Sequence, residues 1–151
     1  MASALTASWR YQDCWLGLGL SLHPMIDRAG VAAWIEAYER AWRMPDTEPL
    51  ADLFDEDASY RMSPYEDPAR GLREIGELWE RERDGAEEKF GMTARIVAVE
   101  GDTAVVRVEV DYARSERYRD LWILHFGADG RCVEFEEWPF WPGKELPTIG
   151  G

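Results

Sequence analysis

The spacing of apolar residues along the chain changes once, from the period of a helix to that of a strand. Near the start they recur three or four positions apart, which is typical of a helix that buries one face, at Val31, Trp34, Ile35, Tyr38, Ala41 and Trp42. Asp27 is placed to cap this helix, and Pro45 ends it. A short second helix should open at Glu48-Pro49 and close at the acidic run 55–57, before a brief extended piece over 58–62.

A third helix and four strands complete the pattern. The helix is predicted over 72 to about 84, because one of its faces is apolar at Leu72, Ile75, Leu78 and Trp79. Beyond Gly91 the period becomes two, which predicts strands over 92–100, 103–114, 118–126 and 131–138. Helices come first and a sheet of antiparallel hairpins follows, so we predict an α+β fold rather than a parallel sheet.

Alternation within the strands assigns their faces. The inner row of the second strand is predicted to be Val106, Val108, Val110 and Tyr112, and that of the last strand Val133, Phe135 and Glu137. In the strand between them both rows are largely apolar, and parity alone leaves His125 on either face. We assign Asp120, Trp122 and Leu124 inward because Phe126 would then seal the core beside the turn. That choice puts Asp120 near the mouth of a pocket.

Several segments, taken in their order, resemble the SnoaL-like, nuclear transport factor 2-like superfamily, which has the cystatin-like cone fold. These segments are the run Trp34 to Trp42, the stretch Leu53-Phe54-Asp55-Glu56-Asp57-Ala58-Ser59-Tyr60, Pro64-Tyr65, Pro68-Ala69-Arg70-Gly71 and the closing Glu137-Trp138. The resemblance covers about Asp27 to Pro142. It implies three N-terminal helices packed on a strongly curved antiparallel sheet, which forms a cone with an internal pocket. It also implies dimerisation through the outer face of the sheet.

The resemblance leaves the activity open, because the superfamily includes ketosteroid isomerase, scytalone dehydratase, limonene epoxide hydrolase, polyketide cyclases and members that only bind ligands or partners. The isomerases carry a general-base Asp on the short extended piece. The resemblance puts Met62 at that place, and a thioether cannot take a proton. Asp67 lies several residues away in a Pro-flanked loop, where ordinary turn chemistry explains it.

Length and charge narrow the class of protein. The 151 residues suit one domain, which we place at 25–143 between tails at 1–24 and 144–151. The net charge of −13 argues against nucleic acid as a partner, and no stretch has the roughly 20 apolar residues that a membrane helix requires. Cys14 and Cys132 are far apart and suggest reduced thiols. We therefore predict a cytoplasmic protein that binds neither nucleic acid nor membrane.

The candidate chemistry is acid/base work without a cofactor. The sequence has no paired His or Cys ligands for a metal, no phosphate-binding glycine loop and no serine in a nucleophile elbow. Asp120 and Glu137 are the candidate catalytic residues, although Asp120 also suits a surface ion pair and Glu137 a structural carboxylate held by a tyrosine or arginine. The predicted pocket wall is largely aromatic: Trp34, Tyr38, Tyr60, Met62, Tyr65, Trp79, Tyr112, Trp122, Leu124 and Trp138.

Three functions fit these residues. The preferred one is binding of a small, largely apolar molecule without turnover, by a homodimer. The second is a cofactor-free isomerase, dehydratase, cyclase or epoxide hydrolase that uses Asp120 or Glu137 as base and tyrosine hydroxyls as donors. The third is a homodimeric association module whose cone is filled by side chains.

Overall fold

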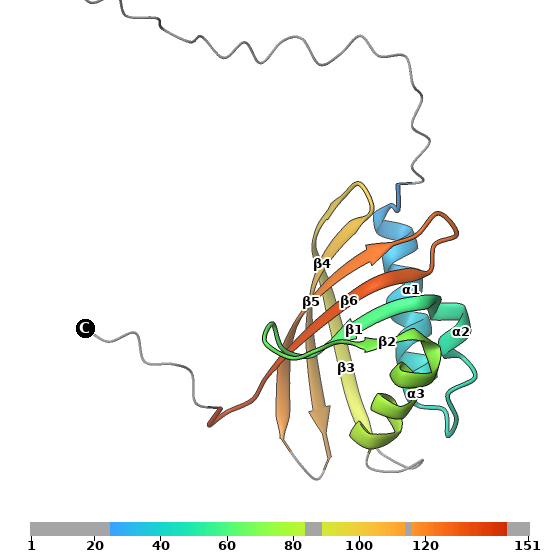
Figure 1. Cartoon of the computed structure of the whole chain (residues 1–151). Helices are drawn as coiled ribbons and strands as arrows, with labels where there is room; N and C mark the ends of the chain where they lie inside the picture. Colours follow the sequence, from blue (N-terminus) through green and yellow to red (C-terminus); the bar gives the residue numbers. More distant parts are fainter. Residues whose placement is uncertain (1–24, 84–88, 114–115, 145–151) are drawn as a thin grey trace, which may run out of the picture.

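The computed structural model describes residues 25–83, 89–113 and 116–144 (Figure 1). The tail predicted at 1–24, and all of the tail predicted at 144–151 except Lys144, lie outside these residues. The elements, in chain order, are α1 (Arg28–Trp42), α2 (Leu50–Leu53), β1 (Phe54–Arg61), β2 (Ala69–Arg70), α3 (Gly71–Glu82), β3 (Phe90–Glu100), β4 (Thr103–Tyr112), β5 (Arg117–Phe126) and β6 (Cys132–Phe140). The strands form one curved sheet in the order β2-β1-β6-β5-β4-β3, and α1 lies across one of its faces.

The helices follow the predicted pattern closely. The Asp27 side chain caps α1 by accepting a hydrogen bond from the Gly30 backbone N–H at 2.7 Å. The apolar stripes of α1 and α3 are buried except for Trp42 and Leu72, which are partly buried. Gly71 begins α3 with a φ of 75°, a left-handed conformation that favours glycine. The α+β class is therefore confirmed.

The start of β1 corrects the prediction for the acidic run. Residues 55–57 do not close a helix but lie inside the strand, which begins at Phe54. The pairing of β1 with β6 jumps from Phe54 opposite Cys132 to Ser59 opposite Glu134. The acidic side chains therefore sit in an irregular stretch, where they can face water without breaking a regular ladder.

The sheet is not wholly antiparallel, as we expected it to be. Strands β1 and β6 are parallel neighbours, whereas every other pair is antiparallel. Parallel neighbours need a long connection, and here α3 and four strands lie between them in the chain. Local hairpin signals cannot reveal such a pairing.

Face assignments hold on β4 and β5 but fail at one residue of β6. Val106, Val108 and Val110 are buried, and so are Trp122 and Phe126. Val133, which we expected inside, is exposed, while its neighbour Cys132 is buried. The register shifts there, because Phe126 pairs with Cys132 but His125 pairs with Glu134. Val133 is the extra residue of a bulge, and alternation does not carry across it.

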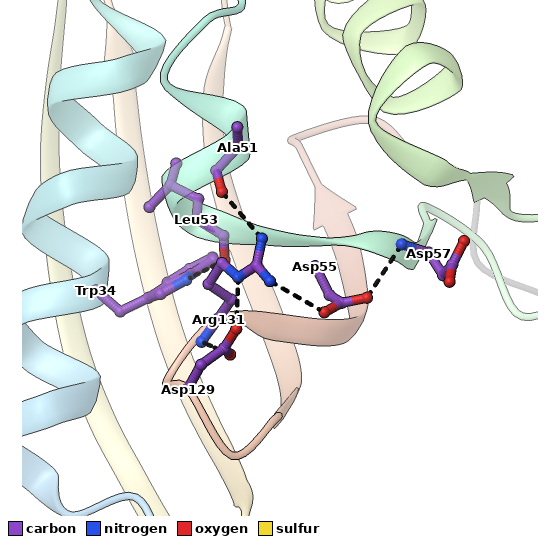
Figure 2. A network of polar contacts seen from close by, with 7 residues as sticks. All are labelled: Trp34, Ala51, Leu53, Asp55, Asp57, Asp129 and Arg131. Atoms are coloured by element: carbon purple, nitrogen blue, oxygen red, sulfur yellow. Dashed lines mark hydrogen bonds and ion pairs between the residues drawn. The ribbon is translucent and has the colours of Figure 1, made fainter.

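The core is an aromatic cluster centred on Trp34. Its ring lies 5.4–6.5 Å, between centroids, from five other rings, those of Tyr38, Phe54, Trp122, Phe126 and Phe135. The indole N–H of Trp34 donates to the Leu53 carbonyl at 2.9 Å (Figure 2). Beside this bond, Arg131 contacts Ala51, Asp55 and Asp129 and so joins the β5–β6 turn to the start of β1.

Replacing Trp34 with Phe should lower the free energy of unfolding by about 2 kcal/mol, since the change removes a buried hydrogen bond and part of a packed ring. Urea denaturation monitored by far-UV circular dichroism would measure the loss. Trp79→Phe is the matched control, because Trp79 is as buried as Trp34 and its indole N–H has no hydrogen-bond partner within the described residues. Equal losses in the two variants would contradict the role given to the Leu53 bond.

Candidate functional site

A pocket of about 530 Å³ opens where α1 and α3 face the inner side of the sheet. Its wall includes both candidate carboxyls, Asp120 and Glu137, and six of the ten residues predicted to line it, which are Tyr38, Tyr60, Met62, Trp79, Tyr112 and Trp122. The wall also contains residues that the sequence analysis did not select: Trp42, Glu66, Leu78, Glu82, Phe90, Met92, Val110, Tyr118, Pro139 and Trp141. Phe90 and Met92 could have been found from their pairing with Tyr112 and Val110.

The other four predicted wall residues lie elsewhere. Trp34 and Leu124 are buried in the core and do not line the pocket. Tyr65 is 98% exposed on the loop after β1, and Trp138 pairs with Leu121 on the outer face of the sheet. Alternation along a strand fixes the face of a side chain but not its depth along the cone, and this explains Leu124.

The two carboxyls come together because β5 and β6 are neighbours. Trp122 pairs with Glu137, and Asp120 pairs with Pro139, so the carboxyls are diagonal neighbours on the inner face. Asp120 is 7% exposed, and Glu137 is half-buried on the pocket wall. The predicted surface ion pair for Asp120 does not form within the described residues, where Arg119 contacts Glu109 instead.

Two tyrosines extend this pair into a chain of hydrogen bonds. The Tyr60 hydroxyl, from β1, donates to Glu137 Oε2. The Tyr38 hydroxyl, from α1, lies 3.2 Å from that of Tyr60. Because Tyr60 has one hydroxyl proton and gives it to Glu137, Tyr38 must be the donor in the second bond. The chain therefore runs from Tyr38 through Tyr60 to the Glu137 carboxylate.

The pair holds a proton near neutral pH. Burial, reinforced by the charge of Glu137 and the hydrogen bond to it, raises the pKa of Asp120 to about 8. Burial also raises the pKa of Glu137, but hydrogen bonds from Tyr60 and Asp120 oppose this rise by favouring its ionised form. We therefore assign the shared proton to Asp120 and the negative charge to Glu137. Burial holds the pKa of both tyrosines well above the ordinary range, so they remain donors.

Three buried polar atoms of the wall have no hydrogen-bond partner in the described part of the chain. They are Asp120 Oδ1, Trp79 Nε1 and Trp122 Nε1. The Trp122 indole lies beside both carboxyls and lowers the pKa of each, yet its N–H makes no bond of ordinary geometry. Buried polar atoms are rarely left unpaired, so these atoms mark where a bound molecule would add contacts.

The remaining candidates do not join the site. His125 lies on the outer face of the sheet, with Nδ1 2.9 Å from the Thr103 hydroxyl. The face of His125 could not be decided from the alternation of residues alone. Burial raises the pKa of the Cys132 thiol to about 12, which makes it a poor nucleophile. Cys14 falls outside the described residues. Among residues 25–83, 89–113 and 116–144, no group of His, Cys, Asp or Glu is placed to hold a metal ion, and no helix is long and apolar enough to cross a membrane.

Comparison with known proteins reveals similarity in fold. A model of the SnoaL-like domain matches residues 31–135. Similar solved structures include a protein of unknown function with a cystatin-like fold from Methylobium petroleophilum, with 16% identity over 85% of this chain and 86% of that one and a TM-score of 0.62. An NTF-2-like protein of unknown function from Burkholderia xenovorans has 18% identity over 79% and 89%, with a TM-score of 0.61. A steroid delta-isomerase from Pseudomonas aeruginosa has 20% identity over 78% and 83%, with a TM-score of 0.54. No curated protein matches the chain.

Proposed function

The chain belongs to the SnoaL-like domain family, and from this we propose that its pocket binds a small, largely apolar molecule and transfers a proton to or from it without a cofactor. The observation that carries the proposal is the Asp120–Glu137 pair, which lies on the wall of an aromatic pocket and holds one proton near neutral pH. A general acid or base works best when its pKa is near the working pH. Aromatic walls favour an apolar ligand.

The two carboxyls have different roles in this proposal. Glu137, ionised and bonded to Tyr60, is the base that accepts a proton from the bound molecule. Asp120, which keeps its proton, is the acid that donates to an oxygen on which negative charge develops. Tyr38 stabilises the ionised state of Glu137 only through Tyr60, which makes it a positioning residue.

The position of Met62 separates this site from that of the steroid isomerases. Met62 lies on the pocket wall, at the place where the resemblance implies a general-base Asp. The solved steroid delta-isomerase shares the fold at 20% identity, which does not transfer its activity to this chain. Any proton transfer here is expected to depend on Glu137 of β6 instead.

Hydrogen–deuterium exchange at carbon tests this function directly. The full chain would be incubated in D₂O with a panel of small cyclic and aryl ketones, and deuterium gain would be followed by mass spectrometry. We expect exchange above the buffer rate for at least one class of ketone, and loss of that exchange in the double variant Asp120→Asn/Glu137→Gln. Equal exchange in the double variant would show that the carboxyl pair is not the proton-transfer group.

Binding without turnover is the second candidate, favoured by Met62 and by the three unpaired buried atoms of the wall. In this case the pair would be a polar anchor for a retained ligand. Native mass spectrometry of the purified protein would detect a bound small molecule. Recovery of that molecule unchanged after long incubation, with no exchange in D₂O, would support binding over catalysis.

We propose that the protein is a cytoplasmic homodimer, paired through the outer face of β5 and β6. Leu121, Ile123 and Trp138 gather there and are half-buried. Light scattering after size-exclusion chromatography should give twice the chain mass of 17.4 kDa, and Ile123→Lys should shift the protein toward monomer. A monomer at every concentration would contradict this assembly. The buried free thiol of Cys132 suits a reducing compartment.

A further inference from the structure

The pocket carries negative charge that lacks a counter-ion. Its charged wall residues in the described part of the chain are Glu66, Glu82, Asp120 and Glu137, and no Lys, Arg or His lies among them. Within the same residues neither Asp120 nor Glu137 forms an ion pair. Buried charges are almost always paired, because leaving water is costly for an ion. Glu137, half-buried on the pocket wall, accepts a hydrogen bond from Tyr60 but has no positively charged partner among these residues.

Basic side chains lie against rings of the pocket wall, Arg83 over Trp42 and Trp79 and Lys144 over Trp141, and their hydrogen bonds go to other groups than the carboxyl pair. The Arg43 guanidinium lies 3.9 Å from the centre of the Phe90 ring and pairs with a glutamate of α1. Arg83 donates to backbone carbonyls of residues 41, 44 and 46. Lys144 donates to a backbone carbonyl of β6 and has only the smallest of the effects on the pKa of Asp120. None of them neutralises Glu137.

The entrance and the walls favour a positive charge. A second hollow adjoins the pocket and shares Tyr60, Met62, Glu66, Leu78 and Glu82 with it. Its charged lining consists of five acids and two arginines: Glu66, Asp67, Glu74, Glu77, Glu82, Arg73 and Arg81. Together with the net charge of −13, this lining produces a field that draws cations toward the pocket. Within the pocket, ring faces that do not already hold Arg43, Arg83 or Lys144 would attract a further cation.

We propose that the ligand of this pocket is an organic cation, a small apolar molecule whose ammonium group lies against Glu137. The inference rests on the proposed function in taking Glu137 as the ionised member of the pair and as the base. It replaces the acid role of Asp120, because a bound cation would displace the Asp120 proton and itself offset the negative charge. A second observation points the same way: Asp120 is 7% exposed on the pocket wall, and its Oδ1 has no hydrogen-bond partner among the described residues. An ammonium beside the pair would satisfy both carboxyls.

Binding of such a cation should release a proton from the protein. A positive charge beside two carboxyls favours ionisation of both, and Asp120 is the one that still holds a proton. The other titratable or charged groups that face the pair are Tyr38 from α1, Tyr60 from β1, Glu82 from α3 and Lys144 after β6. The two tyrosines keep their protons near neutrality, so the released proton comes from Asp120.

Isothermal titration calorimetry with matched probes tests the inference. The probes are benzyltrimethylammonium, its neutral carbon isostere neopentylbenzene and the anion 4-phenylbutanoate. The quaternary cation has no proton of its own, so any proton released comes from the protein. At pH 7 we expect the cation to bind at least tenfold more tightly than the isostere, and the anion to bind most weakly. Titrations in phosphate and Tris, which differ in ionisation heat, should show up to one proton released per cation bound and none with the isostere.

Substitutions test whether Glu137 is the group that attracts the cation. Glu137→Gln should bring the cation-to-isostere affinity ratio close to one, whereas Asp57→Asn, which removes an exposed acid on β1, should leave it unchanged. If Glu137→Gln does not fold, Asp120→Asn decides instead, because it should keep the cation preference and abolish proton release. A ratio near one in the native protein, or a preference that survives Glu137→Gln, would overturn the inference. Ketone exchange without a preference for the cation would refute the ligand class and leave the proton-transfer proposal standing. A preference for the cation without ketone exchange would support the ligand class and contradict proton transfer.

Discussion

The Asp120→Asn variant is expected to be more stable than the native protein at pH 9, by several kcal/mol. The carboxyl titrates at 3.8 in an ordinary setting and at about 8 in the folded protein. Between these values the unfolded chain gives up the proton and the folded chain keeps it, so rising pH stabilises the unfolded state. One group shifted this far contributes on the order of 5 kcal/mol, which is fully lost once the pH passes about 8. Asparagine resembles the protonated acid and has no such loss.

Urea denaturation at pH 5, 7 and 9 would give the free energy of unfolding of each protein, and the effect would be a difference in how steeply that free energy falls with pH. The native protein should lose stability steadily across this range, while the variant should lose much less and overtake it. The burial of Glu137 contributes to both proteins with the same sign, but the variant also alters the hydrogen bond that Asp120 makes to Glu137. The difference therefore measures Asp120 together with its coupling to Glu137. Asp57→Asn is the control, because it removes an acid from the exposed side of β1. Parallel curves for native protein and Asp120→Asn would mean that Asp120 is ionised in the fold.

The same carboxyl illustrates how far alternation can be followed from sequence. The inner rows of β4 and β5 could be predicted because neither strand is interrupted between Val106 and Val110 or between Asp120 and Phe126. On β6 the bulge at Val133 interrupts the alternation between the two faces of the strand. Glu137 still faces inward, as Phe135 does, because the bulge lies before both residues. A bulge has no residue signature of its own here, so the sequence could not reveal it.

The hydrogen-bond partners of Asp120 and Glu137 were still harder to predict from the sequence. Tyr60 and Glu137 are 77 residues apart and meet because β1 lies parallel to β6, a contact that no hairpin signal predicts. A tyrosine could be expected from the sequence as a hydrogen-bond partner of Glu137, but which tyrosine could not. Depth was equally hidden: Trp122 and Leu124 share one face, yet only Trp122 reaches the pocket. Periodicity predicts the direction in which a side chain points, whereas strand register and sheet curvature determine which residues it contacts.

Replacing Glu137 with Gln is expected to lower the rate of proton transfer by about 10²–10⁴-fold, the usual contribution of a positioned acid or base. In the native protein kcat/KM should rise as Glu137 loses its proton and fall near pH 8 as Asp120 loses its own, giving a bell-shaped profile. Glu137→Gln removes the group responsible for the acidic limb. Measurement needs only the substrate class that shows exchange in D₂O.

Tyr60→Phe distinguishes a base from a structural carboxylate. Loss of the Tyr60 hydroxyl removes a hydrogen bond that favours ionised Glu137, so the pKa of Glu137 should rise and the acidic limb should move to higher pH. Because the base itself remains, the rate should recover part of its native value as the pH is raised, which Glu137→Gln cannot do. Tyr38→Phe, which acts only through Tyr60, should shift the limb less. If Tyr60→Phe lowered the rate equally at every pH, Tyr60 would be contacting the substrate rather than lowering the pKa of Glu137.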